Sequence, residues 1–144
     1  MKKLLVTAFF LTLAVNAQAC NITFTSTSEK VTDVLTKNGF GFDDYGAVCK
    51  RLNSNNARLF IEGQAGVLEG RSIAWASVQV GDKNLHIIAN GFGASEVRTS
   101  PYASIDEANK ILLNAINSSI NKTEIEKSIG ELDKSRKKLK AAYK

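Results

Sequence analysis

The sequence predicts an α+β domain: a three-stranded antiparallel meander packed by two short N-terminal helices, a C-terminal helix and a helical basic tail. The run from Arg71 to Val80 alternates with the two-residue period of a β-strand, with alanines and valines on one face and Ile73 and Trp75 on the other. The run 105–120 repeats apolar residues at helical spacing. A helix is therefore expected to pack closely on the alanine side of a central strand.

The first nineteen residues have the pattern of a secretory signal peptide. Lys2 and Lys3 form a positively charged start, Leu4 to Val15 is mostly apolar, and Ala17-Gln18-Ala19 is a small-x-small cleavage site. The apolar run is short for a membrane span, although an uncleaved anchor stays open as an alternative. The pattern is typical of bacteria, so we expect export to the periplasm or beyond. The expected division is a leader over 1–19, one domain over 20–121 and a basic helical tail over 122–144.

Cys20 and Cys49 are the only cysteines of the chain. An even pair in an oxidising compartment usually forms a disulfide. Closing such a loop would stabilise the fold by roughly 3–4 kcal/mol in the chain-entropy model. The alternative is that Cys20 is the acylated first residue of a lipoprotein, because it follows the cleavage site directly. Ala17 stands where lipoproteins usually carry Leu, which favours the disulfide.

Two short helices are expected before the sheet. The run 21–25 is β-like and either adds an edge strand or simply leads into the fold. Ser26 and Glu29 have the spacing of a capping box for a helix over 26–38. Asp43 or Asp44 would cap the second helix.

The tetrapeptide Asn-Gly-Phe-Gly occurs twice, and it contributes Phe40 and Phe92 to two loops, with Phe42 close behind the first. One interpretation is a pair of aromatic loops that meet a common partner. The other is two ordinary turns, since Asn-Gly is a favoured turn dipeptide. These three aromatic residues are candidates for partner binding.

The sheet is expected from three runs. The first strand covers 57–68, and Glu69-Gly70 is a hairpin turn to the central strand. A second turn over 81–84 would lead to a third strand that starts at Leu85, with pairing resumed near Val97.

Ser104 and Glu107 form a capping box for the long helix that follows the sheet. We expect this helix to cover the sheet, with Leu112 packed against Ile73 or Trp75.

The basic excess of the chain lies in its tail. Residues 122–144 contain eight basic and four acidic residues, whereas 20–121 contain nine basic and ten acidic ones. The tail also carries a heptad-like apolar seam, too short for a coiled coil, and the pattern leaves open whether it packs on the domain. Arg136 interrupts the seam, so we expect it to weaken docking and 134–144 to be dispensable for folding. Arg136, Lys137 and Lys138 are candidates for contact with an anionic partner, such as lipid head groups, lipopolysaccharide or an acidic protein. The alternative is a solvated helix end.

Catalytic chemistry has little support in the sequence. His86 is the only histidine and falls in a predicted strand, and the acids Glu62, Glu69 and Glu96 are scattered around the sheet. No phosphate-binding loop or metal-ligand cluster is apparent. We expect no enzyme, no cofactor, no metal site and no nucleic-acid binding.

These observations favour a small exported protein that binds a partner in the bacterial envelope, such as an inhibitor, immunity or accessory factor. Two alternatives remain. One is a binder of a small ligand or envelope lipid that uses the sheet face around Trp75 and the Phe-Gly loops. The other is a hydrolase that uses His86 or the scattered carboxylates. A deep pocket would favour these alternatives, whereas a flat exposed aromatic patch would favour a partner-binding protein. The sequence leaves the oligomeric state open.

Overall fold

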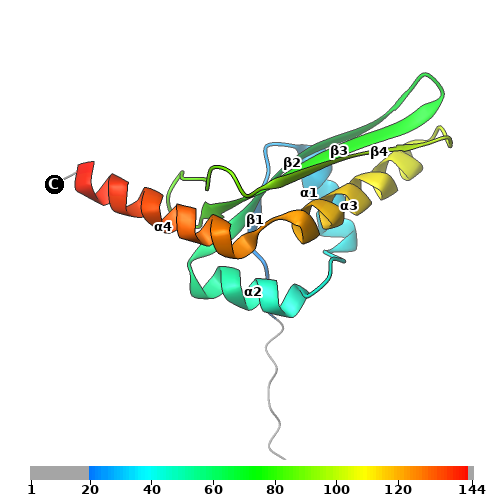
Figure 1. Ribbon diagram of the computed structural model, residues 1–144. Coiled ribbons are helices and arrows are strands. Elements are labelled where there is room, and N and C mark those ends of the chain that lie inside the picture. The colour runs from blue at the N-terminus through cyan, green and yellow to red at the C-terminus, as the bar shows by residue number, and fades with distance from the viewer. Residues whose placement is uncertain (1–19, 143–144) are drawn as a thin grey trace, which may run out of the picture.

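The computed structural model describes residues 20–142, which form a four-stranded mixed sheet packed against four helices. The elements in chain order are β1 (Phe24–Thr25), α1 (Glu29–Asn38), α2 (Tyr45–Ser54), β2 (Ala57–Leu68), β3 (Arg71–Asp82), β4 (Ala94–Ser100), α3 (Ile105–Lys122) and α4 (Ile125–Ala142). α3 runs beneath the sheet, α4 continues from it past the end of the sheet, and α2 lies below (Figure 1). The expected α+β class is confirmed, while the leader expected over 1–19 lies outside the described residues.

The sheet has one strand more than the three expected, in the order β1-β2-β3-β4. The run 21–25 contributes the extra strand, since Phe24 of β1 pairs in parallel with Leu59 of β2. The predicted hairpin between β2 and β3 is confirmed. Its turn residues Glu69 and Gly70 have φ angles of 49° and 73°, and two successive positive values are what a tight two-residue hairpin turn requires.

The prediction that the third strand starts at Leu85 is wrong, because the third antiparallel strand is β4. The carboxylate of Asp82 accepts hydrogen bonds from the amides of Asn84 and Leu85, each at 2.7 Å. Such a local side-chain turn competes with a strand ladder for the same amides. The chain therefore leaves the sheet here, and the segment that follows keeps only one isolated bridge, Gly81 to Ile88.

The core lies between the alanine face of β3 and α3. Ala74 and Ala76 are at most 1% exposed, and Leu112 and Ile116 of α3 are fully buried. The close approach of a helix to the alanine side is thus confirmed. The predicted contact of Leu112 with Trp75 or Ile73 is wrong, because alternate residues of a strand point to opposite faces and Trp75 lies on the face away from α3.

Helix caps were predicted with mixed success. Ser104 caps α3 as expected, accepting from the amide of Glu107 at 3.0 Å. α1 is capped by Ser28 rather than Ser26, and the Ser26 hydroxyl instead accepts from the Ser28 amide. Asp44 stands at the N-cap of α2 with φ 53° and makes no side-chain cap hydrogen bond. Both Ser26 and Ser28 are of a residue type favoured at helix N-caps. Only the path of the chain from β1 decides which of them caps α1.

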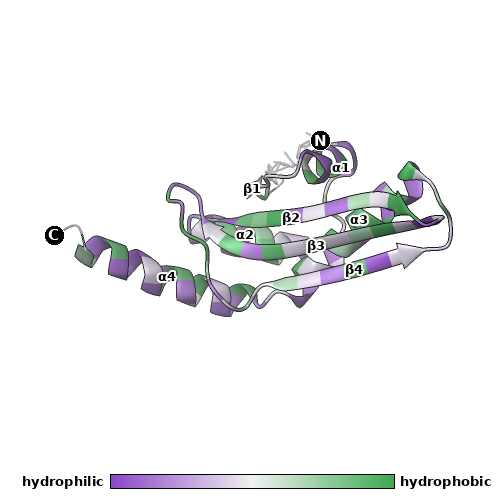
Figure 2. Cartoon of the chain, turned by 90° about the horizontal axis from the view of Figure 1, so that it is seen from above, coloured by the Kyte–Doolittle hydropathy of each residue, from purple (hydrophilic) through white to green (hydrophobic). Residues whose placement is uncertain are grey.

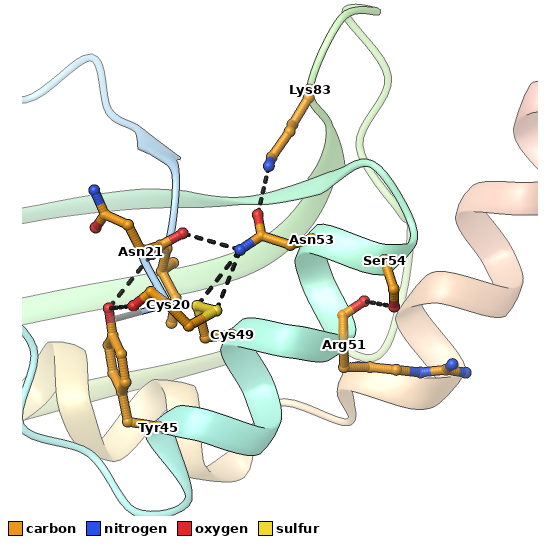
Figure 3. The surroundings of a disulfide bond; sticks show 9 residues. Cys20, Asn21, Tyr45, Cys49, Arg51, Asn53, Ser54 and Lys83 are labelled. Atoms are coloured by element: carbon orange, nitrogen blue, oxygen red, sulfur yellow. Dashed lines mark hydrogen bonds between the residues drawn. A yellow bond between two sulfur atoms is a disulfide. The ribbon is translucent and has the colours of Figure 1, made fainter. Parts of the chain in front are cut away.

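The predicted disulfide between Cys20 and Cys49 is confirmed (Figure 3). It ties the start of the described chain to α2, and the Tyr45 hydroxyl donates to the Cys20 carbonyl at 3.1 Å. The side-chain amide of Asn53 faces both sulfur atoms and accepts from Lys83 through its oxygen (Figure 3). A Cys20 sulfur bonded in this way cannot also carry a lipid. The bond is typical of proteins in oxidising compartments.

No helix among residues 20–142 is long and apolar enough to cross a membrane.

Candidate functional site

The upper face of the sheet, away from the helices, exposes a group of apolar side chains. Trp75 of β3 is 41% exposed, and the register places it directly opposite Val97 of β4, which is 70% exposed. Ile73 and Leu68 point to the same face at neighbouring positions of the pleat. We call these four residues the Trp75 face. Figure 2, which views the molecule from above, shows no helix crossing β2, β3 and β4 on this side.

A shallow hollow lies beside Trp75. Its volume is about 260 Å³, and its lining comes from the β2–β3 hairpin. The lining residues are Gln64, Ala65, Gly66, Val67, Leu68, Ile73 and Trp75. Gly66 stands opposite Ile73, and a side chain added there would meet no atom within 4 Å. The missing side chain of Gly66 therefore helps to leave an indentation in an otherwise filled sheet surface.

A polar row borders the Trp75 face on one side. Glu62, Ser77 and Ser95 lie opposite one another across β2, β3 and β4. The Glu62 carboxylate accepts hydrogen bonds from the amide and hydroxyl of Thr27, at 2.8 and 2.7 Å. An apolar centre with a polar border is the usual composition of a protein-binding surface.

The sequence-predicted candidates Phe40 and Phe42 pack into the domain. They form an aromatic cluster with Phe24 and Tyr45, with ring centroids 5.5–6.4 Å apart. Phe42 is 7% exposed. Edge-to-face contacts of this kind stabilise a core, so these two rings have little surface left for a partner.

Phe92, in the loop before β4, lies against the start of α4. Its carbonyl accepts from the Glu124 amide at 3.0 Å, and the Lys127 ammonium lies 5.6 Å from its ring centroid. The first aromatic loop is held by α3, since the amide of Gly41 donates to Asn117 at 3.0 Å. Both Asn-Gly-Phe-Gly loops are thus fastened to the α3–α4 region as structural turns.

Arg136 has a structural contact that the sequence did not indicate. It lies on α4 with a side chain 17% exposed, and it pairs with Asp82, which is 3% exposed. Its Nε donates to Asp82 at 2.7 Å, and its Nη2 donates to the carbonyls of Asn55 and Asn56 at 3.0 Å. The expectation that Arg136 weakens docking is wrong, because its guanidinium satisfies polar groups at the end of the sheet while Leu132 enters the core.

The pKa of Asp82 lies below its usual range. Burial opposes the charge, but the amides of Asn84 and Leu85 and the guanidinium of Arg136 outweigh it by donating to the carboxylate. The pair is therefore ionised on both sides at neutral pH.

Lys137 and Lys138 are exposed on α4, and neither makes an ion pair with any residue from 20 to 142. Lys134, by contrast, pairs with Glu131 at 2.6 Å. The three adjacent basic candidates thus divide into one structural residue, Arg136, and two solvent-facing lysines.

The potential catalytic groups are not brought together. His86 is exposed in the loop after β3 rather than in a strand, and the small hollow that it lines contains no carboxylate. Glu96 is bound by Lys122 and Arg98, and the hydrogen bond from Lys122 lowers the pKa of its carboxyl. Within 20–142, no three His, Cys, Asp or Glu side chains gather as a metal site would require.

Two further hollows are larger than the one beside Trp75. One, of about 340 Å³, lies between α1 and α3 and is lined largely by charged and polar side chains. The other, of about 430 Å³, lies between α2 and the start of α4, with Val48 and Ile125 half-buried and charged residues around them. The remaining lining residues of this second hollow are Ala47, Arg51, Glu124, Glu126 and Lys127.

The sequence indicated the sheet face around Trp75 only as a possible site for a small ligand or lipid, and it did not indicate that Leu68 and Val97 extend this face. The alternation of Ser95, Val97 and Thr99 was a weak signal that β4 turns an apolar residue outward.

Comparison of the chain with protein-family models, with curated proteins and with solved structures found no match.

Proposed function

We propose that this protein is a small exported binding protein without enzymatic activity, and that its Trp75 face docks another protein of the bacterial envelope. The observation that carries the proposal is the apolar group on an uncovered sheet face, in which Leu68, Trp75 and Val97 are exposed and Ile73 is half-buried. Trp is one of the residue types enriched among those that dominate protein–protein affinity.

The shape of this surface supports a protein partner over a small ligand. Ligand pockets usually enclose most of their ligand, whereas the hollow beside Trp75 is lined by exposed and half-buried side chains. A broad face of low relief suits a partner of comparable size. Export is supported by the leader pattern and by the disulfide between Cys20 and Cys49.

The test is affinity capture from a native envelope extract, followed by binding measurements with the purified partner. Trp75→Gln should weaken binding by about 30-fold, the equivalent of ~2 kcal/mol at a dominant interface residue. Ile105→Gln is the matched control, because Ile105 is also an exposed apolar residue, at 55%, but belongs to α3. Equal weakening by both variants, or none by Trp75→Gln, would remove the Trp75 face from the mechanism.

A second candidate function rests on Lys137 and Lys138 of α4, which make no ion pair within the described part of the chain. Lys137 and Lys138 would attract an anionic lipid surface, with an effect screened over a Debye length of about 8 Å at physiological salt. Vesicle flotation with phosphatidylglycerol should show binding that falls with salt and with the double change Lys137→Gln and Lys138→Gln. Equal binding to neutral phosphatidylcholine vesicles would contradict this electrostatic function.

A further inference from the structure

β4 is an open edge of the sheet. Its neighbour on one side is β3, and no described strand pairs with its other side. Figure 2 shows no further strand beyond β4. Alternate backbone N–H and C=O groups of such an edge point outward and are available for pairing with another chain.

The side-chain pattern of β4 is complementary to that of a second copy of the same strand in antiparallel orientation. The strand covers Ala94–Ser100, so its central residue is Val97. If two copies of the strand pair antiparallel over their full length, Val97 meets its own equivalent and Glu96 of each copy lies opposite Arg98 of the other. Ser95 then lies opposite Thr99. Opposite charges and hydroxyl pairs are both favourable across antiparallel strands.

The pair of Glu96 and Arg98 includes a hydrogen-bond donor that no described residue uses. Glu96 and Arg98 are partners of Ala76 and Ala74 in the ladder, so both lie on the helix side of the sheet. Arg98 already contacts Glu96 of its own chain at 3.4 Å, yet its side chain is 39% exposed and its Nε has no hydrogen-bond partner. A buried donor without an acceptor is costly. A carboxylate from a second copy would lie beside this guanidinium.

The upper, apolar side of β4 is also suited to pairing with a second copy. Val97 is 70% exposed, the largest fraction within the Trp75 face. Symmetric pairing would cover each Val97 with the other and would place the two Trp75 rings on one continuous upper surface. Burial of exposed apolar area stabilises association.

The helices leave room for this arrangement. α3 lies beneath β3, with contacts to β2 and β4 on either side. Strands are spaced by about 4.8 Å, so two β3 strands separated by two β4 strands would lie roughly 14 Å apart. Packed helices need only 8–10 Å between their axes.

We propose that this protein forms a two-fold homodimer through antiparallel pairing of β4 with β4 of a second copy, centred on Val97, to give a continuous eight-stranded sheet. Charges that point inward on an edge strand normally discourage pairing. Here Glu96 and Arg98 are arranged so that a copy of the same strand is accepted, while strands without this pattern meet unpaired charges. The inference concerns the sheet edge and does not rest on the binding function proposed for the Trp75 face.

The test exploits the charge pattern. The full-length chain is expressed with its leader in a Gram-negative host, and the exported protein is studied by sedimentation velocity over a range of concentrations. Wild type should show a monomer–dimer equilibrium. Glu96→Arg and Arg98→Glu should each weaken self-association at least tenfold, since each places like charges opposite one another. An equimolar mixture of the two variants should restore the dimer, because both cross-strand pairs are again opposite in sign.

Controls separate this effect from misfolding. Lys110→Glu reverses a charge on α3 that is 71% exposed, and it should leave the dimer unchanged. Val97→Cys tests the axis independently of charge: it should give a disulfide-linked dimer on a non-reducing gel, whereas Ser95→Cys, whose equivalents lie apart, should not. A wild type that stays monomeric, a mixture that fails to recover the dimer, or equal cross-linking by the two cysteine variants would overturn the proposal.

Discussion

The ion pair between Arg136 and Asp82 is the sharpest prediction that the structure makes about stability. Changing Arg136 to Ala would leave the Asp82 carboxylate, 3% exposed, with only the amides of Asn84 and Leu85 as donors. Removing one partner of a buried pair typically costs ~3–5 kcal/mol. Because Asp82 keeps two amide hydrogen bonds, we expect the lower end of this range, about 3 kcal/mol.

The assay is equilibrium unfolding in urea. For an m value of about 2 kcal/mol per molar urea, the unfolding midpoint of Arg136→Ala should fall by roughly 1.5 M. The double change with Asp82→Asn should cost less than the sum of the single changes, because the orphaned charge is then absent.

The matched control is Arg51→Ala. Arg51 also forms an ion pair with α4, to Glu126, but the two side chains are 45% and 67% exposed. Exposed pairs contribute about 0–1 kcal/mol. If Arg136→Ala costs no more than Arg51→Ala, the reasoning about burial is refuted.

Three further predictions follow from the same structure. Reduction of the Cys20–Cys49 bond should destabilise the fold by roughly 3–4 kcal/mol in the chain-entropy model, seen as a lower unfolding midpoint in reductant; an unchanged midpoint would contradict it. Gly63→Ala should unfold at lower urea than wild type, because a Cβ there would lie 2.6 Å from the Trp75 carbonyl, whereas Gly66→Ala meets no atom within 4 Å and should differ little; similar midpoints for the two variants would show that the sheet relaxes. The pKa of Asp82 in the folded protein lies below the ordinary value of an aspartate, so its stabilisation is present above the unfolded pKa and is lost as the pH falls through the folded pKa; Asp82→Asn should flatten this part of the stability–pH curve, and an unchanged slope would argue against the shift.

Local patterns predicted the elements whose signals are periodic. The alternation along β3 predicted both the strand and the close approach of a helix to its alanine face, because only small side chains allow that approach. The capping pattern at Ser104 likewise marked the start of α3. These inferences succeeded because neighbours within a few residues supply the physical cause.

The sequence patterns were less informative where a side-chain hydrogen bond or a packing partner overrides a local preference. Leu85 begins a run that suits a strand, yet Asp82 takes the amides that would begin the ladder. The candidate aromatics Phe40 and Phe42 look like exposed loop residues in the sequence, but β1 and α2 enclose them.

The sequence by itself determined the class of the fold, the leader pattern and the sides of β3, since each depends on composition or on a short period. It favoured the pairing of Cys20 with Cys49, which the structure then decided. Only the tertiary structure decided which face of the sheet stays uncovered and which charge of the tail is structural. Arg136 is separated from Asp82 by 54 positions, and no local pattern links them. Burial depends on what the remainder of the chain places over a residue, so the role of Arg136 and the exposure of Trp75 emerge only when all the elements are packed.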